Sequence, residues 1–281
     1  MQRYFLSILA ISGFLLAGLI PVKAAVSEWV SVHGGAVRLI ASGPPENGMY
    51  RAGLEFSLEP GWHTYWRSPG ESGIPPSIQI SAPANLASSA VLFPAPKRYD
   101  DGFSSSIVYE DAVVLPLEIT PDSIRKPIEL SVTVFFGICK DICVPADAAL
   151  TLQLSPEAKP DKLATMLIER DRALVPGSEN DEAPSIERVE AETTAKGHHL
   201  VISALVSPTD QVDLFAEGPD GSYIALPKLE ERAGTHAVWS LSTRGLARTD
   251  TGSSLTFVLI DGTRSIESRF EVPAEMLSPE K

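Results

Sequence analysis

Residues 128–145 read IELSVTVFFGICKDICVP, and this stretch decides the fold class. It begins with an apolar run, Leu130–Phe136, whose valines and phenylalanines favour a β-strand. The run leads into Cys139, three residues intervene, and Cys143 precedes the start of a second apolar strand. The spacing predicts a β-hairpin with a three-residue loop, in which the two cysteines face each other across the ladder.

The two cysteines of this hairpin can form a disulfide. Residues that flank such a loop lie about 4.5–5.5 Å apart between Cα atoms, which a disulfide can bridge. Pro145 cannot donate a hydrogen bond to a sheet, so the second strand is expected at an edge, where another protein could reach the sulfurs. Because a ring of about five residues stabilises a fold by only about 2 kcal/mol, a redox role and a structural role have equal weight on these features alone.

Short apolar runs separated by turns rich in proline and glycine occupy both halves of the chain. The first half contains Val37–Ile40, Gly53–Leu58, Ser77–Ile80, Val113–Ile119, Ile128–Phe136 and Ala149–Leu154. The second half contains His199–Val206, Val212–Ala216, Tyr223–Leu226, His236–Leu241, Leu255–Ile260 and Ile266–Val272. Strands at this spacing, without amphipathic helices between them, favour sandwiches over a parallel α/β sheet.

Between the two halves the pattern changes to a short helix and a polar segment. Apolar residues recur at helical spacing after Pro160, namely Leu163, Met166, Leu167 and Leu174. The acidic residues from Glu179 to Glu192 are expected to form a solvated linker. We therefore expect an all-β protein with β-sandwich domains over residues 25–156 and 186–281, joined by a helix and acidic linker over residues 157–185.

Composition and the start of the chain restrict the class of protein. Of 281 residues 44% are hydrophobic, which suits a packed core, and the formal net charge of -13 disfavours a nucleic-acid partner. Residues 1–24 combine Arg3, an apolar run over Phe5–Ile20 and a small-residue end at Val22-Lys23-Ala24. This is typical of a cleaved secretory signal, since a membrane-spanning anchor helix, the alternative, needs about 20 apolar residues.

Four motifs occur in a fixed order along the first half of the chain. They are GWHTYWRSPGESG at residues 61–73, FPAPKR at 93–98, VYED at 108–111 and CKDICVP at 139–145. Together they resemble the N-terminal periplasmic domain of the DsbD/ScsB thiol:disulfide interchange proteins, and within that family its ScsB-like branch. The resemblance covers about residues 28–155, and more loosely the remainder as a second immunoglobulin-like module.

The resemblance implies an immunoglobulin-like sandwich in which Cys139 and Cys143 are the redox pair. Such a domain passes electrons to oxidised periplasmic thioredoxin-like proteins and uses no cofactor. The sequence ends at Lys281, before the membrane-embedded and thioredoxin-like parts of the family. We therefore expect a periplasmic thiol–disulfide exchange component, a protein-disulfide reductase, whose electrons come from a separate membrane protein.

Further site residues follow from the same resemblance. His63 and Tyr65 alternate on one strand, so both are expected to face the cysteines. The segment Lys97–Phe103 matches the family's lid loop, with Tyr99 or Phe103 as the covering aromatic. Satisfied polar groups in the interior are the alternative for His63 and Tyr65, and a plain exposed loop is the alternative for the lid.

Other residues that could carry chemistry have simpler interpretations. Trp62 and Trp66 are expected in the core, and no metal site is expected at His198-His199 because neighbouring strand residues point to opposite faces. Two alternatives to exchange remain at this point. One is a binding module with a structural disulfide, and the other is a copper-tolerance protein that binds Cu(I) through its thiolates.

Overall fold

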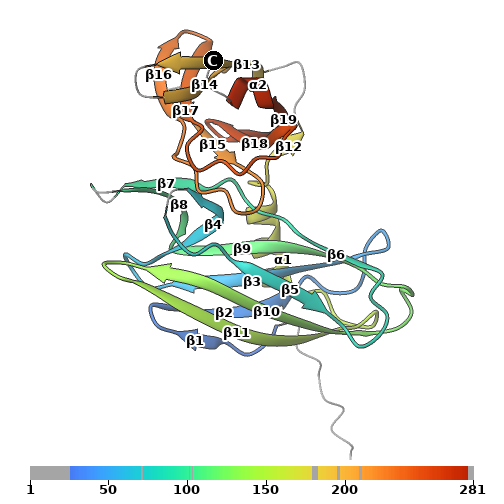
Figure 1. Cartoon of the computed structure of the whole chain (residues 1–281). Coiled ribbons are helices and arrows are strands. Elements are labelled where there is room, and N and C mark those ends of the chain that lie inside the picture. The colour runs from blue at the N-terminus through green and yellow to red at the C-terminus, as the bar shows by residue number, and fades with distance from the viewer. Residues whose placement is uncertain are drawn as a thin grey trace, which may run out of the picture.

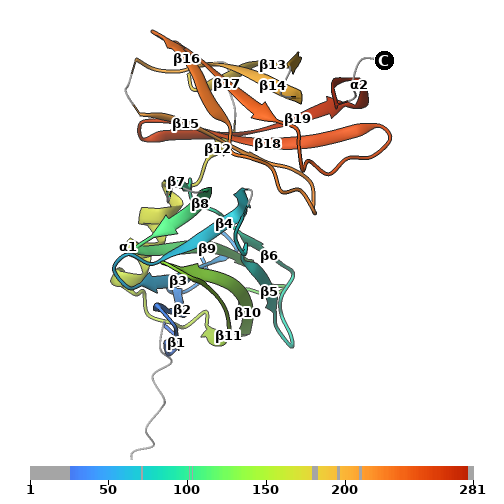
Figure 2. The ribbon, with the colours of Figure 1, turned by 60° about the vertical axis from the view of Figure 1, so that its left-hand side comes forward.

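The fold consists of two β-sandwiches stacked one above the other, as Figure 1 and Figure 2 show. The computed structural model describes residues 26–70, 72–100, 102, 104–178, 183–194, 197–208 and 211–277. The predicted signal peptide over residues 1–24 lies outside these ranges, and none of the helices within them is long and apolar enough to cross a membrane. The all-β, immunoglobulin-like class is confirmed, while the residue bounds of the two domains stay a prediction.

The N-terminal sandwich encloses its core between two antiparallel sheets. In spatial order, the first sheet contains β1 (Val30–Val32), β2 (Gly35–Ala41), β3 (Tyr50–Leu58), β9 (Ala112–Thr120) and β6 (Ser88–Val91). The second contains β11 (Cys143–Leu154), β10 (Ile128–Cys139), β4 (His63–Gly70), β8 (Ser105–Glu110) and β7 (Lys97–Asp100), and β5 (Ser77–Ser81) also pairs with β10. Phe136 of β10 packs edge-on against Phe56 of β3 in this core, with ring centroids 5.1 Å apart.

The C-terminal sandwich has two four-stranded sheets around a second core. One contains, in order, β12 (Gly177–Ser178), β19 (Arg264–Pro273), β18 (Gly252–Asp261) and β15 (Val212–Glu217). The other contains β13 (Ser185–Thr194), β14 (Gly197–Leu205), β17 (His236–Ser242) and β16 (Lys228–Ala233), and a short helix α2 (Ala274–Leu277) ends the described chain. The fully buried rings of Trp239 and Phe257 lie in this core.

Two sequence expectations for this half were wrong. The run Tyr223–Leu226 forms no strand, because Tyr223 N–H donates to the carbonyl of Gly245 and Leu226 leaves the sheet to pack against the N-terminal core. Part of the acidic stretch is not a linker. From Ser185 onward it is strand β13, whose charged residues line the exposed side while Val189 is buried.

Helix α1 (Lys162–Arg172) packs on the outer face of the first sheet, and it does so with an unexpected side. Ala164 and Ile168 are buried against Ile40 and Val114, whereas Met166 is 60% exposed. Of the apolar positions expected from the sequence, Leu167 packs partly buried against this cluster, whereas Leu163 and Met166 are exposed. A buried carboxylate on the packed side decides the orientation, since the side chain of Asp171 accepts a hydrogen bond of 2.5 Å from the backbone N–H of Val114.

We predict that Ile168→Ala lowers the free energy of unfolding by about 2–4 kcal/mol, because it leaves a cavity between α1 and the sheet. Met166→Ala on the same helix is the matched control and should change it by less than about 0.5 kcal/mol. Urea unfolding followed by tryptophan fluorescence measures both. Equal losses in the two variants would contradict the orientation of the helix.

Candidate functional site

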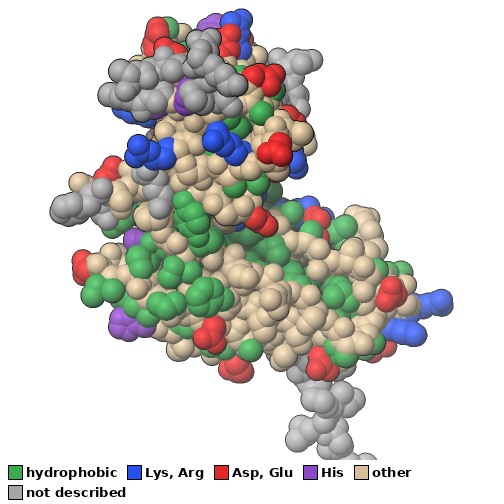
Figure 3. Space-filling model, in the orientation of Figure 1, with side chains coloured by type: hydrophobic (Ala, Val, Ile, Leu, Met, Phe, Trp, Pro, Cys, Tyr) green, Lys and Arg blue, Asp and Glu red, His purple; other side chains and the backbone are tan. Residues whose placement is uncertain are grey.

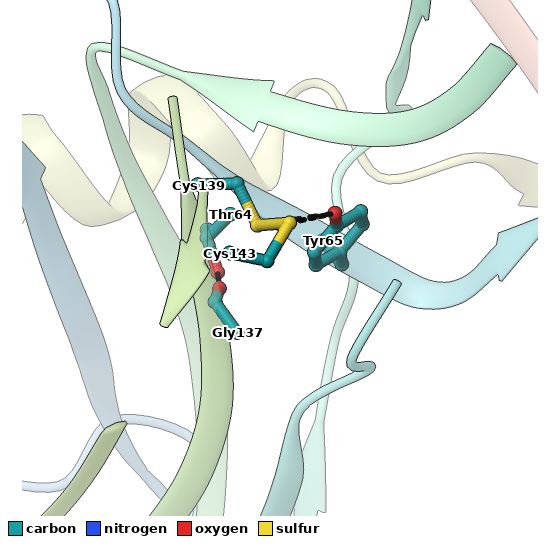
Figure 4. The surroundings of a disulfide bond; sticks show 5 residues. All are labelled: Thr64, Tyr65, Gly137, Cys139 and Cys143. Atoms are coloured by element: carbon teal, nitrogen blue, oxygen red, sulfur yellow. Dashed lines mark hydrogen bonds between the residues drawn. A yellow bond between two sulfur atoms is a disulfide. The ribbon is translucent and has the colours of Figure 1, made fainter. Parts of the chain in front are cut away.

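The cysteine hairpin has the residue pairing that its spacing predicts, with the two Cα atoms slightly closer than expected. Cys139 ends β10, Cys143 begins β11, and the two residues are directly paired in the ladder with a disulfide between them and 4.1 Å between their Cα atoms (Figure 4). Strand β11 lies at the edge of its sheet, with Pro145 opposite Gly137, as the proline indicated. The disulfide therefore closes the tip of an edge hairpin.

The two cysteines differ sharply in their exposure to solvent. Phe136 and Ile138 point into the core, so the alternation of β10 sends Cys139 to the outer face of the sheet. Cys139 is nevertheless only 1% exposed, because it packs in a small cluster with Tyr65 and Val108 outside the main core. Cys143 is exposed. One sulfur-bearing residue is covered, and the other is open to a partner.

Tyr65 is the polar side chain that meets the disulfide. Its Oη lies 3.1 Å from the Sγ of Cys139 and 3.1 Å from the Sγ of Cys143 (Figure 4). Two glycines leave room for its ring. A Cβ on Gly73 would collide with the ring, and a Cβ on Gly137 would lie 3.1 Å from it. Gly73 also has a φ of +123°, which residues with a side chain rarely adopt.

His63 and Tyr99 complete an aromatic group around the sulfurs. His63 of β4 pairs with Cys139 of β10, and its ring is perpendicular to that of Tyr65 at 5.7 Å between centroids. Tyr99 of β7 lies against His63 at 4.3 Å between centroids and packs on the cluster that covers Cys139. The structure thus brings together every site residue expected from the sequence except Phe103, which lies outside the described residues. Their functional roles stay a prediction.

Thr64 was missed by the sequence reasoning. It lies between His63 and Tyr65, and its Oγ1 donates a buried hydrogen bond of 2.7 Å to the carbonyl of Gly137 (Figure 4). The bond ties β4 to β10 two residues before Cys139. The motif at residues 61–73 contained Thr64, but alternation alone assigned it to the side away from the cysteines.

A surface hollow of mixed character lies at the tip of the cysteine hairpin. Ile142 is 75% exposed there, and the hollow is also lined by His33, Trp62, Lys140, Asp141 and Val144. Figure 3 shows apolar side chains gathered over this end of the N-terminal sandwich. Trp62 is half-buried and packs edge-on against His33 at 4.9 Å between ring centroids, so it belongs to this surface in part.

The other candidates from the sequence lie elsewhere. Trp66 is 1% exposed in the N-terminal core, as expected. His198 and His199 are half-buried on β14 in the second sandwich. Within the described ranges, no group of three or more His, Cys, Asp or Glu residues is arranged to hold a metal ion.

Comparisons with known proteins fit this geometry. Residues 38–155 match the family described as "Thiol:disulfide interchange protein DsbD, N-terminal". The chain is also similar in structure to the N-terminal periplasmic domain of ScsB from Proteus mirabilis, with 24% sequence identity and a TM-score of 0.69. That similarity covers 89% of this chain and 98% of the other, so the shared fold includes both sandwiches. A search of curated proteins found no match.

We predict that replacing both cysteines, Cys139→Ala with Cys143→Ala, leaves a folded protein that is about 2 kcal/mol less stable, because the ring is short. Urea unfolding of the double variant and of the oxidised parent measures the difference. A double variant that is unfolded at 25 °C would assign the disulfide a structural role.

Proposed function

Because residues 38–155 form a DsbD/ScsB-like N-terminal domain, we propose that the Cys139–Cys143 pair exchanges thiols and disulfides with periplasmic proteins. The observation that carries the proposal is the asymmetry of the pair. Cys143 is open to solvent, Cys139 is covered, and one tyrosine hydroxyl contacts both sulfurs. A structural disulfide requires neither an accessible sulfur nor a polar side chain directed at it.

The exchange proceeds in two displacement steps. In the reduced protein the thiolate of Cys143 attacks a disulfide of the partner, forming a mixed disulfide and releasing one partner thiolate. The thiolate of Cys139 then attacks the Sγ of Cys143, which re-forms the internal disulfide and releases the second partner thiol. The partner gains two electrons and this chain loses them. A membrane protein with a dithiol returns the pair to its reduced state.

Tyr65 is placed to assist both steps. Its Oη lies at the same distance from either sulfur, so its O–H can donate to whichever one carries negative charge. A hydrogen bond to the charged form favours that form, which increases the fraction of thiolate at neutral pH. His63 packs against the ring of Tyr65, and Tyr99 packs against His63 and the cluster to which Tyr65 belongs.

The partners are proposed to be oxidised thioredoxin-like proteins of the periplasm. Residues 1–24 have the pattern of an export signal, and the similar ScsB structure is that of a periplasmic domain. Ile142, which is 75% exposed at the tip of the hairpin and precedes Cys143, offers an apolar contact next to the exposed cysteine. Apolar side chains at the centre of an interface are typical of protein–protein contacts.

We predict that Cys139→Ala accumulates mixed disulfides with partner proteins in the periplasm, because Cys143 can still attack but nothing resolves the product. Cys143→Ala should accumulate few. Non-reducing gels of periplasmic extracts, with each adduct identified by mass spectrometry, measure both.

The two single variants control for each other, since each retains one cysteine. The reverse pattern would exchange the roles of the two cysteines. Adducts with neither variant would reject exchange and favour a binding module with a structural disulfide.

We predict that Tyr65→Phe slows alkylation of the reduced pair by iodoacetamide at pH 7 by up to about tenfold, since it removes a hydrogen bond to the thiolate without changing the ring. The difference should vanish at a pH high enough to ionise both thiols in either protein. A slowing that persists unchanged at high pH would show that the hydroxyl acts on access instead of ionisation.

A further inference from the structure

The strand that carries Tyr99 is weakly held within its own sheet. Strand β7 has four residues, lies at the edge of the sheet, and pairs only with β8. A short edge strand of this kind is expected to separate easily, because few backbone hydrogen bonds keep it in place. Side-chain contacts of Lys97 with Glu110 and of Ser105 with Asp100 help to keep β7 on β8, and contacts outside the sheet fix its position further.

Those contacts come from the C-terminal sandwich through Arg98. Arg98 donates from Nη2 and Nε to the two carboxylate oxygens of Asp213 at 2.7 and 3.1 Å. Nη2 also donates to the carbonyl of Pro227 at 2.9 Å, and the guanidinium lies over the ring of Phe215 at 5.7 Å. A two-pronged arginine–carboxylate pair fixes orientation as well as distance. Tyr99 is the next residue along β7.

Strand β4, which carries Tyr65, is also held by the C-terminal sandwich. The residue that makes this contact is Arg67, two residues after Tyr65. Arg67 donates from Nε to Glu217 at 2.7 Å and from Nη2 to Glu267 at 2.5 Å. Burial alone would lower the pKa of the Arg67 guanidinium, but the two carboxylates outweigh it and the pKa is raised. Arg67 therefore stays charged between them.

Apolar contacts reinforce the same junction. Trp66 packs near Phe215 with 6.4 Å between ring centroids. Leu226 occupies the space over Gly70, where a Cβ would lie 2.5 Å from its Cδ1. Figure 2 shows β4, β7 and β8 at the end of the N-terminal sandwich that faces the second one. Both strands that supply side chains around the disulfide are thus anchored from outside their own domain.

We propose that the C-terminal sandwich holds the aromatic cover of Cys139 closed, with Arg98 and Asp213 as positioning residues for Tyr99. A role of the second sandwich in thiol–disulfide exchange rests on the proposed function. The cover itself is a property of the folded chain. Release of the Arg98–Asp213 pair frees β7, moves Tyr99 from His63 and opens Cys139. A partner that competes for Asp213 would thereby gain access to the covered sulfur.

The test is the rate at which a maleimide labels Cys139 in the full chain carrying Cys143→Ala, the parent of every variant below. The thiolate of Cys139 adds to the maleimide double bond, and because the sequence has two cysteines, the label then reports access to Cys139 alone. Asp213→Ala should raise the rate by up to about fivefold, the factor that a partly buried ion pair imposes on a two-state opening. Asp213→Asn keeps the shape and an acceptor oxygen but not the charge, so it should raise the rate less.

Tyr99→Ala distinguishes loss of the cover from a general loss of stability. It should raise the rate at least as much as Asp213→Ala, and the double variant should react no faster than Tyr99→Ala alone. Exchanging the charges, Arg98→Asp with Asp213→Arg, should bring the rate back toward that of the parent. Glu190→Ala removes an exposed ion pair with Arg188 in the same sandwich and serves as the control without effect.

An unchanged rate in Asp213→Ala, or additive effects in the double variant, would overturn the proposal. An unchanged rate in Tyr99→Ala would also overturn it, by showing that this ring covers nothing. Circular dichroism of each variant identifies any that fails to fold, in which case Asp213→Asn carries the test. Because no protein partner takes part, these outcomes are independent of whether mixed disulfides form in the periplasm.

Discussion

The antiparallel ladder between β10 and β11 is the constraint on which the rest of the site depends. Its register runs without a break from Ile128 opposite Leu154 to Cys139 opposite Cys143. Since side chains alternate along a strand, a shift of one residue would exchange the faces of the whole strand. The apolar residues of β10 fix the register by their need for burial. They thereby place Cys139 on the outer face, where Tyr65 and Tyr99 can surround it.

The sequence allowed the hairpin and its disulfide to be predicted, because both follow from local spacing. The sequence also predicted that His63 and Tyr65 lie on one face of their strand. Side chains alternate between the two faces of any strand, so this prediction needs no knowledge of contacts between distant segments. The sequence could not show that the Tyr65 hydroxyl contacts both sulfurs. That contact depends on the space left by Gly73 and Gly137, which come from a loop and from another strand. The contact of Thr64 could not be predicted for a similar reason, because the carbonyl that accepts its hydrogen bond belongs to another strand, β10.

The incorrect expectations share one physical cause. The run Tyr223–Leu226 has strand-forming residues, but Leu226 packs, partly buried, against the other sandwich instead of in a sheet of its own. In α1 the apolar Leu163 and Met166 are exposed, while a buried hydrogen bond from Val114 to Asp171 helps to select the packed side. In both cases a contact between distant segments overrides local preference.

Pro145 has a consequence for how this protein can meet others. A long edge strand offers a row of free backbone groups to which a further strand can add. Pro145 removes one donor from that row within two residues of Cys143, and the exposed carboxylate of Asp147 adds charge just beyond it. Strand addition next to the disulfide is therefore disfavoured, and contacts through side chains are favoured there. With the proposed function, which requires release of each partner after one exchange, such an edge would reduce permanent pairing.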